Sequence, residues 1–352
     1  MGLLTFDSVG ITGMAAAVPA KIINNYEFDL YFSKNDIKDI IDKIGVRERR
    51  FADEKTCSSD LCYTAAEKML TEMNVNRDEI DLLVFISQTP DYRMPATSLL
   101  LQNRLGLSSG TIAFDINLGC SAFLYGLSVV YSMMSGGQIR KALILDGETR
   151  SKVYSLKDRK TGFLFGDAGV AALIECDKKF DKSYISLNSD GSRESLIKIN
   201  AGGYRKMSTC ETLKESVVDE YGNIRSEEQG YMNGADVFTF VIREVPKDFN
   251  RLMEFSGVAI SSIDYYVFHQ ANSYINGFLA KKLKLPLEKV PSTIEKYGNT
   301  SSVSIPLTIV SELNDQLKTR KRLLLSGFGV GMTWGSAMID MENCYIGEIA
   351  EV

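Results

Sequence analysis

The sequence contains an internal repeat, and this repeat restricts the possible folds more than any other feature. Four short segments of the first half reappear in the same order in the second half. The matching pairs are 80–85 with 263–268, 118–122 with 297–301, 142–147 with 323–327, and 169–175 with 335–340. One such match could arise by chance, but four in the same order indicate that a strand–helix unit was duplicated.

Within each half, short apolar runs typical of strands alternate with helical patterns. This alternation predicts an α/β protein with two related βαβαβ-type halves, in which helices cover mixed or parallel sheets and sites lie at the carboxyl ends of strands. We expect an N-terminal half at 1–175 and a C-terminal half at 230–352. The polar segment 176–229 is expected to be an insertion that connects the two halves.

Composition argues against several classes of protein. The 352 residues carry a net charge of −5, which gives no support to a nucleic-acid partner. Six cysteines without a CxxC pair and a single histidine argue for reduced thiols and against a zinc site. Serines and tyrosines interrupt the longest uncharged stretch, 116–139, so a buried helix is expected there rather than a membrane span. The apolar start, 1–20, has no basic region and does not resemble a signal peptide, so we expect a cytoplasmic protein.

Cys120 and His269 are the candidate reactive residues. Cys120 lies between a strand pattern and a long apolar helix pattern, which places its sulfur at a helix N-terminus where the thiolate is favoured. Alone, it could equally be a small core residue. His269, the only histidine, follows a predicted strand, and Asn299 holds the position in the second half that Cys120 holds in the first. Groups at equivalent strand ends of two related halves would meet at the seam between them, as nucleophilic catalysis requires.

A glycine-rich segment, 327–335, lies near the C-terminus. It lacks the phasing and the Lys-Ser/Thr pair of a nucleotide-binding loop. Its glycines predict a loop whose backbone approaches a ligand closely, although a tight turn between two core strands would show the same pattern. An exposed N–H of Val330 could complete an oxyanion hole with the N–H of Cys120.

Six blocks of the sequence resemble the signature blocks of ketoacyl-acyl-carrier-protein synthase III, in the correct order over nearly the whole chain. The blocks are GVRERR at 45–50, NLGCSAF at 117–123, FGDAGVA at 165–171, FHQAN at 268–272, YGNTS at 297–301 and GMTWGSA at 331–337. The resemblance implies the thiolase fold with a layered αβαβα core, and a homodimer. It also implies a catalytic triad of Cys120, His269 and Asn299.

The reaction implied by this resemblance is a condensation in two stages. An acyl group is transferred from a coenzyme A or carrier-protein thioester to Cys120. Malonyl-carrier protein then loses carbon dioxide and attacks the acyl-enzyme, giving a 3-ketoacyl thioester for fatty acid initiation or for a specialised acyl or polyketide pathway. The backbone N–H groups of Cys120 and Val330 would hold the oxyanion. No permanently bound cofactor is implied, because coenzyme A and phosphopantetheine thioesters enter as substrates.

The resemblance also implies substrate and partner contacts outside the triad. Arg159 matches a nucleotide-contacting arginine, and Met94 matches a residue that the partner subunit places in the acyl pocket. The further matches to substrate-binding residues are Phe165, Phe238 and Phe328, and the matches to the docking patch for acyl-carrier protein are Lys281 and Lys282.

Three positions depart from the family pattern. Asp39 stands where members that take acetyl-CoA commonly carry a tryptophan, Lys43 stands where an arginine is common, and Tyr274 replaces an arginine of the docking patch. Asp39 cannot stack on adenine as an aromatic side chain would, and its charge would repel the phosphates of the nucleotide. We therefore expect a primer other than simple acetyl-CoA, either larger or delivered on a carrier protein.

Two other classes of function compete with condensation. An acyltransferase on the same fold would move the acyl group to an oxygen or nitrogen acceptor. A non-enzymatic binding or scaffold protein would need no triad. Simple acyl transfer does not require a pair of groups that stabilises an enolate, so the presence of both His269 and Asn299 favours condensation.

Overall fold

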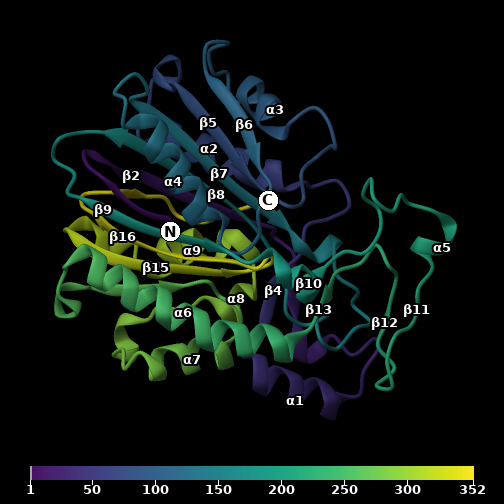
Figure 1. Ribbon diagram of the computed structural model, residues 1–352. Coiled ribbons are helices and arrows are strands. Elements are labelled where there is room, and N and C mark those ends of the chain that lie inside the picture. The colour runs from purple at the N-terminus through teal and green to yellow at the C-terminus, as the bar shows by residue number, and fades with distance from the viewer. Residues whose placement is uncertain (1) are drawn as a thin grey trace.

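The computed structural model describes residues 2–352 and contains two large β-sheets (Figure 1). The first has the strand order β17-β2-β8-β7-β5-β6, with β18 also paired to β2, and the second has the order β1-β9-β16-β15-β14. The strands of the first sheet are β2 (Val9–Val18), β5 (Leu82–Ile86), β6 (Ile112–Ile116), β7 (Lys141–Thr149), β8 (Asp167–Cys176), β17 (Tyr345–Ile346) and β18 (Ala350–Glu351). The strands of the second sheet are β1 (Gly2–Phe6), β9 (Ser183–Ser189), β14 (Tyr265–Phe268), β15 (Lys321–Gly329) and β16 (Thr333–Met341).

Helices separate the two sheets and cover their outer faces. The helices are α1 (Lys34–Ile44), α2 (Ser58–Glu72), α3 (Thr97–Arg104), α4 (Ala122–Met134), α5 (Cys210–Leu213), α6 (Gly234–Ser256), α7 (Ser273–Lys282), α8 (Ile294–Tyr297) and α9 (Ser304–Glu312). Apolar side chains of α4 and α9 form one core with the inner faces of both sheets, while α2 and α3 cover the first sheet and α6 and α7 cover the second (Figure 1). These five layers confirm the α/β fold with a layered αβαβα core.

The two sheets repeat one pairing scheme. In the first sheet β2 pairs antiparallel with β8, β8 antiparallel with β7, and β7 parallel with β5. In the second sheet β9, β16, β15 and β14 follow in the same order with the same directions. The repeated segments of the sequence occupy equivalent strands, since 80–85 overlaps β5 and 263–268 overlaps β14. The duplicated unit is therefore visible in the structure.

The ends of the chain cross between the two halves. Strand β1 pairs with β9 in the second sheet, and strands β17 and β18 pair with β2 in the first. Residues 183–189 of the expected insertion also form β9, a strand inside the second sheet. A boundary at 176 therefore does not separate the sheets, and the part of this segment that lies outside them begins after β9.

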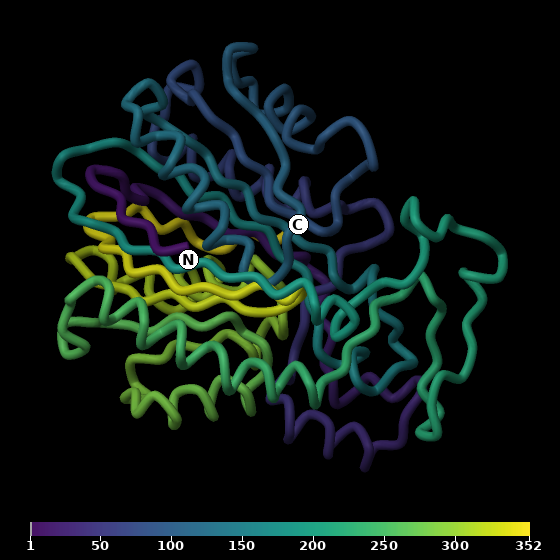
Figure 2. Tube along the Cα trace, viewed as in Figure 1, coloured from purple at the N-terminus to yellow at the C-terminus, as the bar shows by residue number. Residues whose placement is uncertain are grey.

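The chain between β9 and α6 forms loops at one side of the molecule (Figure 2). It contains α5 and two small sheets. The strands of these sheets are β10 (Ile197–Lys198) with β13 (Tyr231–Met232), and β11 (Ser216–Val217) with β12 (Ile224–Arg225). Ion pairs from Glu215, Asp219 and Arg225 hold these loops to residues 157–160 of the N-terminal half. The loops are thereby fixed beside the segment that follows β7.

Helix α4 follows from an almost uniformly apolar sequence. It is packed between the two sheets, so its buried positions lie on every side of the helix rather than on one stripe. This explains the uncharged stretch 116–139 as a core helix. Within the part of the chain that the structure describes, no helix has the length and apolar character needed to cross a membrane.

Candidate active site

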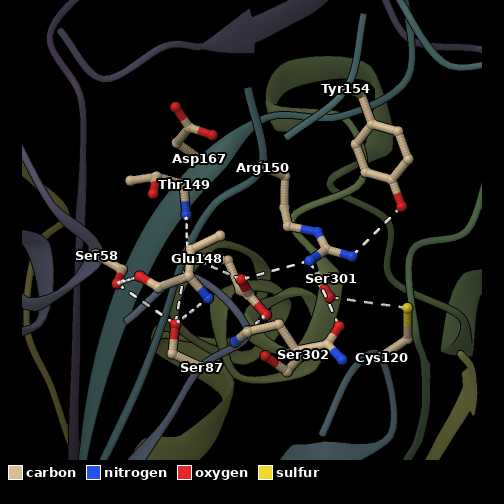
Figure 3. Close-up of polar contacts among 12 residues, drawn as sticks. Ser58, Ser87, Cys120, Glu148, Thr149, Arg150, Tyr154, Asp167, Ser301 and Ser302 are labelled. Atoms are coloured by element: carbon tan, nitrogen blue, oxygen red, sulfur yellow. Dashed lines mark hydrogen bonds and ion pairs between the residues drawn. The ribbon is translucent and has the colours of Figure 1, made fainter. Parts of the chain in front are cut away.

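Cys120 lies in the turn that leads into α4. Strand β6 ends at Ile116 and α4 begins at Ala122, so the sulfur sits at the helix N-terminus, where the sequence predicts it. Cys120 is only 7% exposed. Its Sγ lies 3.8 Å from Oγ of Ser301, which comes from the C-terminal half (Figure 3). The cysteine therefore stands at the seam between the two halves.

The surroundings of Cys120 make its thiol acidic. Burial by itself raises the pKa of this thiol, but His269, Arg150 and Ser301 together outweigh burial and lower the pKa to about 7. The N-terminus of α4 also favours a negative charge at this place. A large fraction of Cys120 is therefore thiolate at neutral pH, and the thiolate is the nucleophilic form.

His269 directly follows β14 and is buried. Its backbone N–H donates to the carbonyl of Ser326, 2.8 Å away on β15. Its Nδ1 lies 2.7 Å from Oγ of Ser304, and the same Oγ accepts the backbone N–H of Gln270 at 3.2 Å. Because Oγ accepts from Gln270, its own hydrogen is free to be donated to Nδ1. In the neutral imidazole, this arrangement leaves the hydrogen on Nε2.

Asn299 is fixed by backbone groups on both sides. Its N–H donates to the carbonyl of Leu164 at 2.9 Å, which ties it to the N-terminal half. Its Oδ1 accepts the N–H of Ser301 at 2.9 Å, and its Nδ2 donates to the carbonyl of Ala271 at 3.3 Å. The amide orientation is thus determined, and Nδ2 keeps a second hydrogen for a ligand.

One cavity of about 70 Å³ brings these three residues together. Of the further predicted site residues, Phe165, Phe328 and Val330 also line this cavity. Its other lining residues are Arg150, Tyr154, Leu164, Ile197, Met232, Gly234, Val237, Val241, Ala271, Asn272, Ile275 and Gly329. The cavity is therefore mainly apolar, with a few polar groups gathered around the cysteine.

The glycine-rich segment passes directly against Cys120. A Cβ added to Gly329 would come within 2.7 Å of both Cβ and Sγ of Cys120. A Cβ added to Gly119 would come within 2.0 Å of the side chain of Val330. The turn interpretation of this segment is confirmed, because β15 and β16 are adjacent core strands. The close approach to a ligand stays a prediction. The backbone around Val330 lies next to the cysteine because glycine leaves room for it.

The other predicted contact residues lie outside the lining of this cavity. Arg159 forms an ion pair of 3.7 Å with Asp36 and lies over the ring of Phe32. Met94 is 77% exposed. Phe238 packs against the aromatic rings of Tyr274 and Phe278, and Lys281 and Lys282 stand in the last turn of α7. Asp39 and Lys43 are both exposed on α1.

The structure adds two residues that the sequence reasoning missed. Arg150 and Tyr154 follow β7 and line the cavity beside Cys120 (Figure 3). Tyr154 stacks on Phe165 with ring centroids 3.9 Å apart. The sequence does contain a feature that could have identified Arg150. Glu148 and Arg150 place two charges at the end of an apolar strand, where sites are expected in this kind of sheet.

Residues 2–352 contain no group of three or more His, Cys, Asp or Glu side chains that could hold a metal ion. The chemistry that the cavity offers is instead that of a thiolate nucleophile, two hydrogen-bond donors on His269 and Asn299, and the backbone N–H groups around Cys120 and Val330.

Comparison with known proteins identifies close relatives. Residues 114–191 match the family model described as 3-oxoacyl-[acyl-carrier-protein] synthase III, and residues 253–341 match the model of its C-terminal part. The β-ketoacyl-[acyl-carrier-protein] synthases III of Streptococcus mutans and Fusobacterium nucleatum are 34% and 32% identical, and each alignment covers 94% of this chain and 98% of the relative. The crystal structure of a 3-oxoacyl-(acyl-carrier protein) synthase from Burkholderia xenovorans superimposes with a TM-score of 0.93 at 36% identity, covering 99% of both chains.

Proposed function

Because this chain belongs to the 3-oxoacyl-[acyl-carrier-protein] synthase III family of condensing acyltransferases, we propose that Cys120, His269 and Asn299 carry out its condensation. The observation that carries this proposal is their convergence. One residue of the N-terminal half and two of the C-terminal half line a single cavity at the seam. Nucleophilic catalysis requires such a meeting of a thiolate with oriented donors.

The first stage loads the cysteine. The thiolate of Cys120 attacks the carbonyl carbon of an acyl thioester, so that a new S–C bond forms and the S–C bond to the carrier thiol breaks. The leaving thiolate takes a proton from water. A pKa of about 7 supports this step, because it supplies thiolate at neutral pH without a separate base.

The second stage makes the carbon–carbon bond. A malonyl thioester loses carbon dioxide, and the electron pair of the broken bond passes into an enolate. Hydrogen on Nε2 of His269 and the free hydrogen on Nδ2 of Asn299 are donated to the enolate oxygen. The enolate carbon attacks the thioester on Cys120, the N–H groups of Cys120 and Val330 hold the oxyanion, and Cys120 leaves as thiolate with a 3-ketoacyl product.

The thioester substrates are proposed to arrive on coenzyme A and on an acyl-carrier protein. Lys281 is exposed in the last turn of α7, and Lys282 donates through Nζ to the carbonyl of Ile242 on α6 at 2.5 Å. Positive charge at a helix end suits an acidic carrier protein, with Lys281 as the freer of the two groups.

The charges on α1, near Arg159, support a primer other than simple acetyl-CoA. Asp36 and Asp39 place negative charge on the exposed side of α1, and Asp36 already pairs with Arg159. A nucleotide phosphate would have to compete with Asp36 for this arginine. We therefore keep the proposal that simple acetyl-CoA is not the preferred donor.

A second copy of the chain is the proposed partner of the exposed segment around Met94. Tyr92, Met94 and Leu99 are 61%, 77% and 48% exposed, which is unusual for neighbouring large apolar side chains. In a homodimer this segment would be covered, and Met94 would approach the acyl pocket of the partner.

The six cysteines are all unpaired, which fits a reducing compartment such as the cytoplasm.

The test of the proposed function is product analysis. The protein is incubated with malonyl-carrier protein labelled in its free carboxyl and with a panel of acyl-CoA and acyl-carrier-protein donors. Carbon dioxide release with a 3-ketoacyl thioester is expected, and the 3-ketoacyl product should disappear in Cys120→Ala. An ester or amide product formed without carbon dioxide would favour acyl transfer to oxygen or nitrogen instead.

A further inference from the structure

Arg150 is a buried cation in the wall of the acyl-binding cavity. It is 5% exposed and begins the short 3₁₀ turn that follows β7. With Tyr154, Ile197 and Val330 it lines both the cavity of Cys120 and a second cavity of about 270 Å³. The guanidinium thus stands where the two cavities meet, beside the place at which an acyl group would be attached.

The guanidinium of Arg150 has more N–H donors than the surrounding protein has acceptors for. It carries five N–H hydrogens. Its NH1 donates to Oε1 of Gln88 over a long 3.4 Å. Its NH2 donates to the hydroxyl of Tyr154, also over 3.4 Å (Figure 3). Its Nε is buried and has no hydrogen-bond partner among residues 2–352. A buried donor without a partner is costly, so a ligand that supplies an acceptor here would be favoured.

The carboxylate of Glu148 is engaged elsewhere. Glu148 lies 3.8 Å from NH1 of Arg150, beyond hydrogen-bond distance. Its two oxygens accept instead from the N–H of Gln88 at 3.2 Å and from the hydroxyl of Thr89 at 3.0 Å. Burial raises the pKa of Glu148, which weakens its charge as a partner for Arg150. Among residues 2–352 the guanidinium therefore has no carboxylate within hydrogen-bond distance.

We propose that Arg150 binds a carboxylate at the far end of the acyl group that is loaded on Cys120. The primer would then be the monothioester of a dicarboxylic acid rather than a simple alkanoyl thioester. A carboxylate can take two parallel hydrogen bonds from a guanidinium, a geometry that a neutral alkyl end cannot offer. This inference rests on the proposed function, because it names the substrate class of the same site.

Loading of such a primer leaves the carboxylate unchanged. The acyl group passes from the carrier sulfur to Sγ of Cys120, one S–C bond forms as another breaks, and the carrier thiol is released. The apolar lining of the cavity, which includes Phe165 and Val237, would contact the methylene groups between thioester and carboxylate. Arg150 is a specificity residue in this scheme, since it contacts the substrate away from the reacting atoms.

Loading rates with matched donors test the proposal. Succinyl, glutaryl and adipyl pantetheine thioesters are compared with neutral thioesters in which an isopropyl group replaces each carboxylate. Pantetheine lacks the nucleotide of coenzyme A, so the charges around Arg159 do not affect the comparison. Intact mass measures acylation of Cys120. We expect the best dicarboxylic donor to load about 10- to 100-fold faster than its neutral match. Arg150→Met should abolish this preference, so that the two donors load at equal rates; the loss of a cation that lowers the pKa of Cys120 slows both donors alike and does not change their ratio.

Three further arms make the result decisive. Arg104→Met, which removes an exposed arginine paired with Asp60, should keep the preference. Arg150→Lys should keep part of it, because the charge remains without the planar donor pair. Binding of the same thioesters to Cys120→Ala by calorimetry measures the preference even if no turnover occurs, so failure of condensation can be told apart from failure of this inference.

Several outcomes would overturn the proposal. Equal loading and equal binding of carboxylate and neutral donors by the wild type would contradict it. Equal losses of both donors in Arg150→Met, with the wild-type preference retained, would show that Arg150 does not bind the carboxylate. A variant that loads every primer normally but no longer decarboxylates malonyl-carrier protein would move the arginine to the second stage of the reaction.

Discussion

Gly329 lies so close to Cys120 that a Cβ at residue 329 would stand 2.7 Å from Sγ. The two residues come from different halves of the duplicated chain, on β15 and at the start of α4. This contact places the backbone that leads to Val330 against the nucleophile. Glycine is required at residue 329 because there is no space for a side chain, and not because of an unusual backbone angle.

The contact predicts the effect of Gly329→Ala. The added methyl group must displace Cys120 or the backbone before Val330, and a shift of this kind is expected to lower the rate of loading about 10- to 100-fold. The measurement is acylation of Cys120 by intact mass, together with the melting temperature. Gly277→Ala is the matched control, since nothing lies within 4 Å of its added Cβ on α7. Comparable loading by the two variants would contradict the assigned geometry.

The acidity of Cys120 predicts a pH profile. The rate of alkylation by iodoacetamide should rise with pH as thiolate forms, with its midpoint near the pKa of about 7. His269→Ala removes a group that lowers this pKa, so the midpoint should move upward, toward the ~8.5 of an ordinary cysteine. Labelling of Cys120→Ala is subtracted to remove the other five thiols. A midpoint unchanged by the loss of His269 would show that the two side chains do not interact.

Asn299 should separate the two stages of the reaction. Asn299→Ala removes a donor to the enolate oxygen, so condensation should fall about 10²- to 10³-fold, while loading of Cys120 should stay within about threefold. Single-turnover measurements of each stage check this split. Asn233→Ala, which removes a comparable backbone-capping amide at the start of α6, controls for a general loss of stability. Loading that falls as much as condensation would argue for a structural role of Asn299.

Much of this site follows from the sequence, because the repeat gave corresponding places to residues far apart in the chain. Cys120, His269 and Asn299 are each found at a strand or helix end that pattern alone could predict. The grouping of Arg150 with Cys120 depends instead on how the segment after β7 turns back over the cavity. The hydrophobic periodicity of the sequence does not predict that turn.

Strand β9 shows why part of the fold was harder to predict. Its sequence, SYISLNS, is polar enough to be read as a connection. In the structure Ser186 and Asn188 both donate to Asp248 of α6, at 2.5 and 2.7 Å. These polar groups are satisfied by a partner about sixty residues away in the sequence, which lets them enter a sheet. Local pattern cannot identify such a partner in advance.

The proposed docking patch predicts an effect confined to the carrier protein. Lys281→Glu should raise the KM for malonyl-carrier protein about fivefold to tenfold and leave the KM for an acyl-pantetheine donor unchanged, because only the protein partner contacts the surface of α7. Lys178→Glu makes the same charge change at another exposed lysine and serves as the control. If both variants alter the carrier-protein KM equally, the effect comes from net charge and the docking site lies elsewhere.

The central claim is that Cys120 carries the acyl group. The most direct test is to incubate the protein with an acyl donor in the absence of malonyl-carrier protein, quench in acid, digest, and locate the added mass by peptide sequencing. One acyl group per chain is expected on Cys120 and none on the other five cysteines, and the group should disappear when malonyl-carrier protein is added. Formation of a 3-ketoacyl product without an acyl group on Cys120, or with the acyl group on another residue, would contradict it.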